Sequence, residues 1–565
     1  MYDHDDSEDR LEISVTPNHL TRRFVLSTLV GMGVGTVAFQ RSLAAQGEQA
    51  GKISAEMIEQ AEWVAGISLN ENEREAVATA VTRDQRNYQA LRKVEIPAST
   101  PPALSFFAAP HQTNREEIRR GDVRPISTLA GPRPTADEDL AFLPVTQLSA
   151  LLRERKISSV ELTQLYLARL QRYDDLLKCV VTLTEDLALE QAERADREIA
   201  AGRYRGPLHG IPWGAKDIIA WPGYKTTFGA GHYKDQTLDL KATVARRLEE
   251  AGAVMVAKTT VGALALGDNW YGGITKNPWN PTEGSSGSSA GSASSVVAGL
   301  VGFAIGTETL GSIVSPCRRC SASGLRPTFG RVSRHGCMAL SWSMDKVGPI
   351  ARSIEDCALI FGAIHGSDGL DPTAVDQPFA WPPRRDVRSL KVGYFESEKP
   401  EGERRELGIL KDLGVKLLPI KLPTKYPIGP TSLILNTEAA AAFDDLTRAG
   451  VSEGLGSWAT AFRKGQFVPA VEYLRAQRVR TLLMREMEEL LAPIDAYING
   501  DDLTLTNLTG HPCVVVPDGE REKSPTNQPD TITFTGKLFG ESDLLALAHA
   551  YQQVSGAHLR RPPLT

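Results

Sequence analysis

The sequence is poor in cysteine, and the few cysteines that it has are dispersed. Six cysteines are spread over 565 residues, which is too few and too scattered for a disulfide-stabilised scaffold. The one CxxC motif, from Cys317 to Cys320, has no second pair at the spacing that zinc ligands require. We therefore interpret it as filler beside a packed loop, and we expect the protein to use neither a metal nor another cofactor.

The chain also lacks a strong excess of charge and a long apolar run. Its formal net charge is -6, with both signs mixed along the chain, which excludes the basic surface typical of a nucleic-acid-binding protein. The apolar run near the N-terminus, which reaches about Phe39, is shorter than the roughly 20 residues that a membrane-spanning helix needs. We expect no nucleic-acid partner, and no stable membrane insertion once the N-terminal signal described below is removed. The composition, 41% hydrophobic and 23% charged, is that of an ordinary globular protein.

The N-terminal region resembles an export signal. Arg22 and Arg23 precede a modest apolar run that reaches about Phe39, and small residues over 42–44 offer a cleavage site. Paired arginines in this position are typical of the twin-arginine pathway. The sequence therefore predicts an export signal over 1–45 and a periplasmic or other extracytoplasmic location, with an uncleaved or amphipathic anchor as the alternative.

Downstream of this signal the chain divides into an extension and a main domain. Apolar residues at mixed spacings of three and four predict helices over 54–66 and 72–94, and the segment 97–134 is rich in proline. We assign 46–135 to a helical extension with a proline-rich linker, and 136–565 to the main domain. In that domain, helices predicted from Ser158 onward and over 185–201 and 242–250 alternate with strand-like segments such as 254–257, which indicates an α/β fold.

The most unusual segment is the glycine- and serine-rich stretch 284–295. Such a composition is typical of a flexible linker, but this one runs directly into the apolar residues 296–301. A phosphate-binding loop would need a lysine followed by serine or threonine after the glycines, and no lysine occurs between Lys276 and Lys346. Glycines recurring in an apolar context favour instead a close approach of the backbone to a ligand.

The same stretch contains a GxSxG motif over 287–291, which would make Ser289 the nucleophile of an α/β-hydrolase-like esterase. That motif needs a strand immediately before the serine, whereas 280–284 consists of turn-forming residues. It also needs a catalytic histidine, and the candidates His335, His365 and His511 stand in no distinctive context. This interpretation remains an alternative for Ser289.

Seven segments, taken together, resemble the amidase signature family, in its peptide-amidase-like branch. The resemblance covers about 140–565 and implies that family's α/β fold, a large mixed β-sheet covered by helices on both sides. The segments follow in the family's order and spacing: 210–217, 277–281, 306–313, 324–333, 345–353, 507–512 and 514–517.

The resemblance also implies an active site. The family's catalytic lysine falls on Lys216, its bridging serine, which stands in a cis peptide, on Ser288, and its nucleophile on Ser312. Consecutive backbone N–H groups that form an oxyanion hole in the family fall on Thr309, Leu310, Gly311 and Ser312. Ser289 is expected to support the site by hydrogen bonding.

This chain departs from the common family pattern at three positions. Many members have aspartate where it has Glu308, glycine where it has Leu310, and arginine where it has Val314. The leucine need not disturb an oxyanion hole built from backbone groups. The loss of the arginine argues against recognition of a substrate carboxylate at that point.

The chemistry explains why a buried lysine is needed. A serine hydroxyl is a weak nucleophile unless a base takes its proton, and lysine is a base only when it is neutral. Burial lowers the pKa of a lysine, and the apolar neighbours of Lys216, including Trp213 and Trp221, predict such a desolvated pocket. The local sequence alone favours an ordinary charged lysine, one that snorkels to the surface or pairs with a carboxylate such as Asp217.

We therefore expect an amidase that hydrolyses a small-molecule carboxylic amide to an acid and ammonia or an amine through an acyl-enzyme on Ser312. The A subunit of a glutamyl-tRNA amidotransferase is the alternative within the family, and a homodimer is a further possibility. The segments 264–270 and 427–467 are candidate walls of the substrate pocket. Trp270 and Tyr271 fit either an apolar acyl site or core packing.

Overall fold

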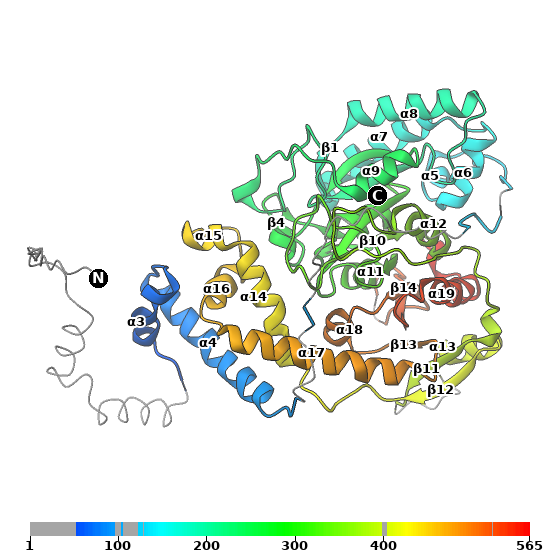
Figure 1. Ribbon diagram of the computed structural model, residues 1–565. Helices are drawn as coiled ribbons and strands as arrows, with labels where there is room; N and C mark the ends of the chain where they lie inside the picture. Colours follow the sequence, from blue (N-terminus) through cyan, green and yellow to red (C-terminus); the bar gives the residue numbers. More distant parts are fainter. Residues whose placement is uncertain are drawn as a thin grey trace, which may run out of the picture.

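The computed structural model describes residues 52–96, 103–104, 122–127, 129–397, 404–522 and 524–564 (Figure 1). The predicted export signal over 1–45 lies outside these residues, as does most of the proline-rich linker. Among the described residues, no helix is both long enough and apolar enough to cross a membrane.

The main domain is built on a mixed sheet of eleven strands within the described part of the chain. Its strand order is β1-β3-β2-β8-β10-β9-β14-β15-β13-β11-β12. β2 lies parallel to both β3 and β8, whereas β8, β10, β9, β14 and β15 follow one another antiparallel. The strands are β1 (Val180–Leu183), β2 (Pro212–Lys216), β3 (Val254–Thr259), β8 (Phe303–Glu308), β9 (Ser323–Arg326), β10 (Lys346–Ala351), β11 (Lys391–Phe395), β12 (Lys416–Ile420), β13 (Ala496–Ile498), β14 (Cys513–Asp518) and β15 (Asp530–Gly536).

Helices cover both faces of this sheet, as the family resemblance implied. Because successive side chains of a strand point to opposite faces, β14 contributes alternately to two hydrophobic clusters. Val514 and Val516 pack in the cluster that contains α12 (Ile354–Ile364) and α19 (Glu541–Ser555). Val515 packs in the cluster that contains α10 (Ala290–Val297) and α11 (Val314–Cys320).

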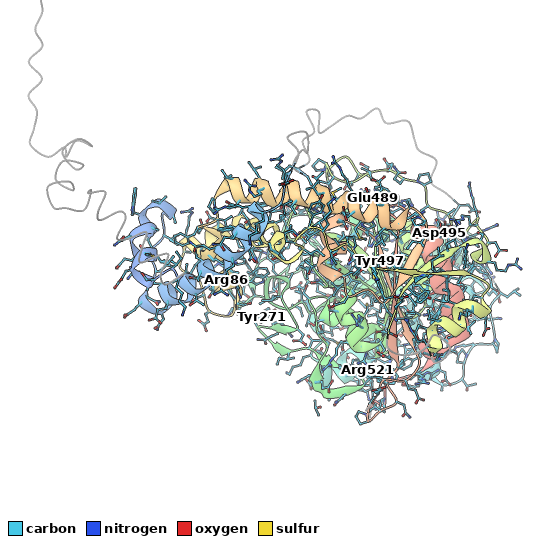
Figure 2. All side chains as sticks on the ribbon, turned by 90° about the horizontal axis from the view of Figure 1, so that it is seen from below. Arg86, Tyr271, Glu489, Asp495, Tyr497 and Arg521 are labelled. Atoms are coloured by element: carbon cyan, nitrogen blue, oxygen red, sulfur yellow. The ribbon has the colours of Figure 1, made fainter. Side chains whose placement is uncertain are left out.

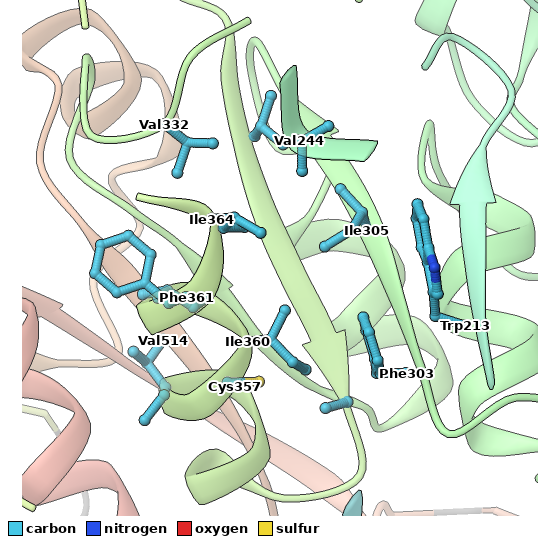
Figure 3. Packing of buried hydrophobic residues seen from close by; sticks show 14 of the residues in the cluster. Trp213, Val244, Phe303, Ile305, Val332, Cys357, Ile360, Phe361, Ile364 and Val514 are labelled. Atoms are coloured by element: carbon cyan, nitrogen blue, oxygen red, sulfur yellow. The ribbon is translucent and has the colours of Figure 1, made fainter. Parts of the chain in front are cut away.

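The first of these clusters fixes the strands that carry the site. Trp213 of β2 stacks on Phe303 of β8 with ring centroids 6.1 Å apart, and Ile305 and Ile360 pack close by (Figure 3). All of these side chains are buried. Removing such large apolar side chains from water stabilises the fold by roughly 2–3 kcal/mol each, which holds β2 and β8 in a fixed relative position.

The predicted helices are confirmed to within about two residues at their ends. α3 (Ala55–Ala65) begins at the N-cap Ser54 and ends at Gly66, whose φ of 66° suits glycine. The N-cap of α4 (Glu71–Arg92) forms a capping box with Glu73, and Ser158 accepts a hydrogen bond from the Glu161 amide at the start of α7 (Ser159–Leu177). α8 (Glu185–Ala200) and α9 (Thr243–Glu250) also lie where they were predicted.

A lobe of helices stands beside the sheet domain (Figure 1). In it, α4 of the N-terminal extension packs against α16 (Trp458–Gly465) and α17 (Ala470–Leu491), which come from a distant part of the chain. Two ion pairs fasten α4 to α16: Arg463 to Glu73 at 2.8 Å and Lys464 to Asp84 at 3.0 Å. The predicted helical extension is thus part of the folded protein.

The remaining α-helices and strands of the described residues complete the two parts. They are α5 (Asp137–Ala141), α6 (Val145–Arg153), α13 (Arg405–Asp412), α14 (Leu433–Ala442), α15 (Asp444–Arg448), α18 (Leu503–Thr509), and two hairpins, β4 (Asn269–Trp270) with β5 (Gly273–Ile274) and β6 (Lys276–Asn277) with β7 (Asn280–Gly284).

Candidate active site

Lys216 is the last residue of β2, a strand whose five residues are all buried. Its side chain has no exposed surface, and its Nζ lies 2.8 Å from Ser288 Oγ and 3.1 Å from Ser289 Oγ. Thr307 of the neighbouring strand β8 contributes its Oγ1 at 2.8 Å and its carbonyl oxygen at 3.2 Å. The amine is thus surrounded by neutral oxygen atoms, with no carboxylate among these contacts in the described part of the chain.

The environment lowers the basicity of Lys216. Burial disfavours the charged ammonium, and although the negative charges of Asp345 and Glu308 act in the opposite direction, the pKa falls to about 7. A lysine with this pKa is largely neutral at pH values only slightly above 7. The desolvated pocket predicted from the apolar neighbours is therefore confirmed.

Asp217 does not pair with Lys216, which settles the alternative that the local sequence left open. Its carboxylate binds Lys258 Nζ at 2.7 Å, and both side chains are completely buried. The other oxygen of Asp217 accepts a hydrogen bond from the Thr227 amide at 2.9 Å. Lys258 of β3 thus neutralises the charge that would otherwise favour a protonated Lys216.

The two serines that contact Lys216 lie in the loop that leads into α10. The peptide bond between Gly287 and Ser288 is cis, as the resemblance implied. Ser289 is fully buried, and its hydroxyl donates to the Thr307 carbonyl at 3.1 Å, so that it supports the loop as expected. Its amide donates to the Ser312 carbonyl at 3.0 Å, which ties this loop to the turn that carries Ser312.

Ser312 lies in the turn between β8 and α11 and is 7% exposed. Gly311 before it has a φ of 86°, a conformation that favours glycine. Within the described part of the chain, the amides of 309–312 donate to no protein group. Four consecutive free N–H groups next to a serine hydroxyl are a suitable binding place for a substrate oxygen. The side chain of Leu310 packs against the hydrophobic cluster around Met344 and leaves these backbone groups unaffected.

Glu308 holds this turn in place. The sequence identified Glu308 only as a departure from the family pattern and did not predict this role. One carboxylate oxygen accepts hydrogen bonds from the amides of Ile313 at 2.8 Å and Val314 at 2.9 Å. The other binds Arg326 and Asn507, each at 2.8 Å. Burial alone would raise the pKa of Glu308. The positive charges of Arg326 and Lys346 have the larger effect and lower the pKa to about 2.

Asp345 connects the turn to the rest of the domain and was likewise not singled out by the sequence. Its carboxylate accepts the Thr309 hydroxyl at 2.6 Å and the amides of Leu340 and Ser341 at 2.8 and 3.0 Å. It is half-buried, and its desolvation raises its pKa. Asp345 is also the charge that most strongly raises the pKa of Lys216. Only its place in the family-like segment 345–353 could have drawn attention to it.

The structure also bears on the predictions for Ser289 as an esterase nucleophile, for the CxxC motif and for Tyr271. The strand needed for an esterase elbow does not precede Ser289, since β7 ends at Gly284 and a loop leads on to the serine. Cys317 and Cys320 are buried free thiols in α11. Tyr271 is 43% exposed on the β4–β5 hairpin (Figure 2), so it belongs to neither the core nor the cavity described below.

The mixed sheet places a buried, weakly basic lysine in contact with a serine, next to a turn whose amides are free. This arrangement defines an α/β enzyme with a serine–lysine site. The family model for Amidase matches residues 161–512. The chain belongs to this family of enzymes, which act on carbon–nitrogen amide bonds.

Individual relatives agree with this assignment. The chain is 35% identical to the A subunit of glutamyl-tRNA(Gln) amidotransferase from Chloroflexus aurantiacus, over 75% of this chain and 99% of that protein. The structure is similar to that of the native peptide amidase from Stenotrophomonas maltophilia, with a TM-score of 0.64, 29% identity, and coverage of 74% and 98%. An amidase family protein from Bacillus anthracis matches with a TM-score of 0.66 and 26% identity, over 76% and 94%.

Proposed function

We propose that the protein hydrolyses a carboxylic amide through an acyl-enzyme on Ser312, with Ser288 and Lys216 as the proton relay. The observation that carries this proposal is the 2.8 Å contact between a fully buried Lys216 amine and Ser288 Oγ. A neutral amine at that distance accepts the proton of the Ser288 hydroxyl, and Ser288 then accepts the proton of Ser312.

The proposed cycle has two halves. Ser312 Oγ forms a bond to the carbonyl carbon, its proton passes through Ser288 to Lys216, and the amides of 309–312 bind the oxyanion. The carbon–nitrogen bond then breaks as the proton returns through Ser288 to the departing nitrogen. Water repeats the sequence on the acyl-enzyme and releases the acid. Each oxyanion donor in such a site contributes about 3–4 kcal/mol to transition-state stabilisation.

Substitution of the three residues tests the proposal. We expect Ser312→Ala to abolish turnover and labelling by a fluorophosphonate, while the circular dichroism spectrum stays that of the wild type. Ser288→Ala should lower kcat by several orders of magnitude, because the proton relay is interrupted. Ser389→Ala, at an exposed serine, is the matched control. Wild-type turnover by the Ser312 variant would overturn the assignment.

The A subunit of a glutamyl-tRNA amidotransferase is the second candidate, and the 35% identity to such a protein favours it. In that case ammonia released at Ser312 would be passed to a partner rather than to solvent. An assay of the isolated chain distinguishes the two: free ammonia from simple amides, without partner subunits, supports the stand-alone amidase. Activity that appears only with partner subunits and charged tRNA supports the second candidate.

The peptide-amidase-like branch and the export signal are parts of the same proposal. The similarity to the peptide amidase structure favours an amide substrate with a bulky acyl part.

Replacement of Arg22 and Arg23 by lysine is expected to keep the protein in the cytoplasm, as measured by cell fractionation. Unchanged fractionation would contradict the export proposal. A homodimer would give twice the chain mass in light scattering after size-exclusion chromatography.

A further inference from the structure

A cavity of about 780 Å³ lies between the sheet domain and the helical lobe. Glu438 of α14, together with Arg480 and Met484 of α17, lines it on the side of the lobe. Phe329 and Trp342 line it from the segment that joins β9 to β10. Its volume is that of a binding site for a ligand of drug-like size.

The cavity is joined to the candidate active site by two hydrogen-bonded links. Asp345 lines the cavity and accepts the hydroxyl of Thr309, the first residue of the oxyanion turn, at 2.6 Å. Met338 also lines it, and its amide donates at 2.9 Å to the carbonyl of Ile218, two residues beyond Lys216. The cavity wall is thus bonded directly to the oxyanion turn and to the segment that follows Lys216.

The mouth of the cavity is apolar although it faces solvent. Six large hydrophobic side chains of its lining are between 38% and 52% exposed: Leu104, Trp342, Leu370, Met484, Leu538 and Phe539. Exposed apolar side chains that gather around one opening mark a binding surface, whereas scattered ones need no explanation.

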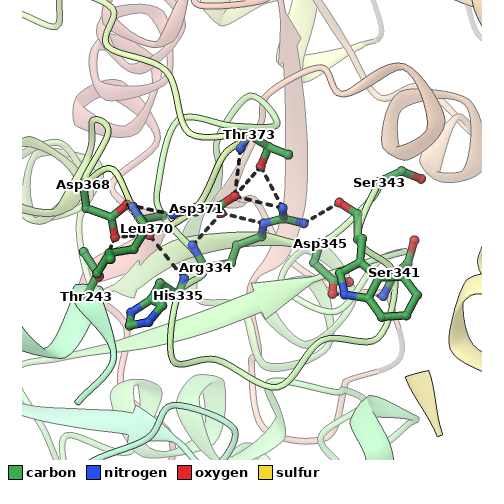
Figure 4. A network of polar contacts seen from close by, with 12 residues as sticks. Thr243, Arg334, His335, Ser341, Ser343, Asp345, Asp368, Leu370, Asp371 and Thr373 are labelled. Carbon is green, nitrogen blue, oxygen red and sulfur yellow. Dashed lines mark hydrogen bonds and ion pairs between the residues drawn. The ribbon is translucent and has the colours of Figure 1, made fainter. Parts of the chain in front are cut away.

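The charged groups of the cavity are already bound to the protein. Arg334 forms a two-pronged ion pair with Asp371 and also donates to Thr373 at 2.7 Å (Figure 4). Arg480 donates to the carbonyl of Ser343 at 2.7 Å and to its hydroxyl at 2.8 Å.

Glu438 is satisfied in the same way. It accepts the hydroxyls of Ser341 and Ser343, each at 2.7 Å, and of Tyr473 at 2.9 Å. Since a charged ligand would have to break these bonds, the lining favours an uncharged ligand.

We propose that this cavity binds the acyl part of the substrate, and that this part is a large uncharged apolar group, aromatic or long aliphatic. The inference rests on the proposed function, because it takes the scissile amide to lie at Ser312. A primary amide releases only ammonia, so that recognition of such a substrate comes entirely from its acyl side. Short aliphatic amides would leave the cavity empty and would be hydrolysed poorly.

A series of primary amides tests the proposal through the release of ammonia. For the wild-type enzyme, kcat/KM is expected to rise about fourfold for each methylene buried, so that 4-phenylbutanamide exceeds acetamide by at least about 100-fold. Trp342→Ala is expected to lower kcat/KM for 4-phenylbutanamide at least about tenfold and for acetamide less than about twofold. Phe539→Ala should act in the same direction, and Trp342→Phe should restore most of the loss.

Trp63→Ala is the matched control, because Trp63 is 81% exposed on α3 and is remote from the lining of the cavity. The acetamide activity reports whether each variant is folded. An unchanged ratio between the two substrates in both Trp342→Ala and Phe539→Ala would overturn the cavity proposal while leaving the amidase intact. Absence of both hydrolysis and fluorophosphonate labelling in the wild type would overturn the proposed function, and the cavity proposal with it.

Discussion

The pH dependence of catalysis is the sharpest test of Lys216 as the base. Burial lowers its pKa to about 7, and only the neutral amine can take a proton from Ser288. We expect log kcat/KM to fall with a slope of about one below pH 7, so that about 1% of the plateau activity remains at pH 5. The assay is the initial rate of ammonia release from a neutral amide, whose own protonation state is constant over this range.

The substitution Asp345→Asn tests whether Lys216 is the group whose protonation lowers kcat/KM at acidic pH. Asp345 is the largest influence that raises the pKa of Lys216, so that removing its charge should move the midpoint to lower pH. Glu438→Gln is the matched control, because Glu438 lines the same cavity but is not among the groups that shift the pKa of Lys216. The midpoint of the pH profile of this variant should stay at about 7. A profile that is flat between pH 5 and 8, or an unmoved midpoint in Asp345→Asn, would refute the reasoning.

The same pKa has a consequence for stability. The pKa of Lys216 is lowered from its ordinary value of 10.5 to about 7, so the folded protein binds fewer protons than the unfolded chain between these values. Stability therefore rises with pH across that window, and the destabilisation is complete below pH 7, where it amounts to about 5 kcal/mol at most. Lys216→Met is expected to remove activity and yet to raise the free energy of unfolding at pH 6, as measured by urea denaturation. A lower free energy of unfolding in this variant would contradict the expectation.

Two further substitutions test the buried charges around the site. Glu308→Gln should lower the free energy of unfolding by about 3–5 kcal/mol, because it leaves the buried Arg326 without its charged partner. Glu283→Gln, which removes the charge from the exposed pair of Glu283 and Arg319, is the control and should change the free energy of unfolding by less than about 1 kcal/mol. Equal effects in urea denaturation would contradict this. Lys258→Met should lower the free energy of unfolding by a similar amount, about 3–5 kcal/mol, because it leaves the buried Asp217 carboxylate unpaired. A stability equal to that of the wild type would contradict this.

The local sequence determined much of the secondary structure. Ser54 and Gly66 set the two ends of α3, and Ser158 begins α7, because capping depends only on neighbouring backbone groups. The order and spacing of the motifs likewise placed Lys216 and Ser288 in one family pattern, and the structure brings these two side chains within 2.8 Å of each other.

Tertiary structure alone decided the state of the lysine and the shape of the cavity. The pairing of Asp217 with Lys258 rather than Lys216 depends on the parallel register of β2 and β3, which no local pattern specifies. The cavity combines Trp342 with Arg480, residues that come together only when the helical lobe packs beside the sheet. Sequence could name the residue types that amide hydrolysis needs, but desolvation and charge pairing act through space, and so the basicity of Lys216 follows from the fold.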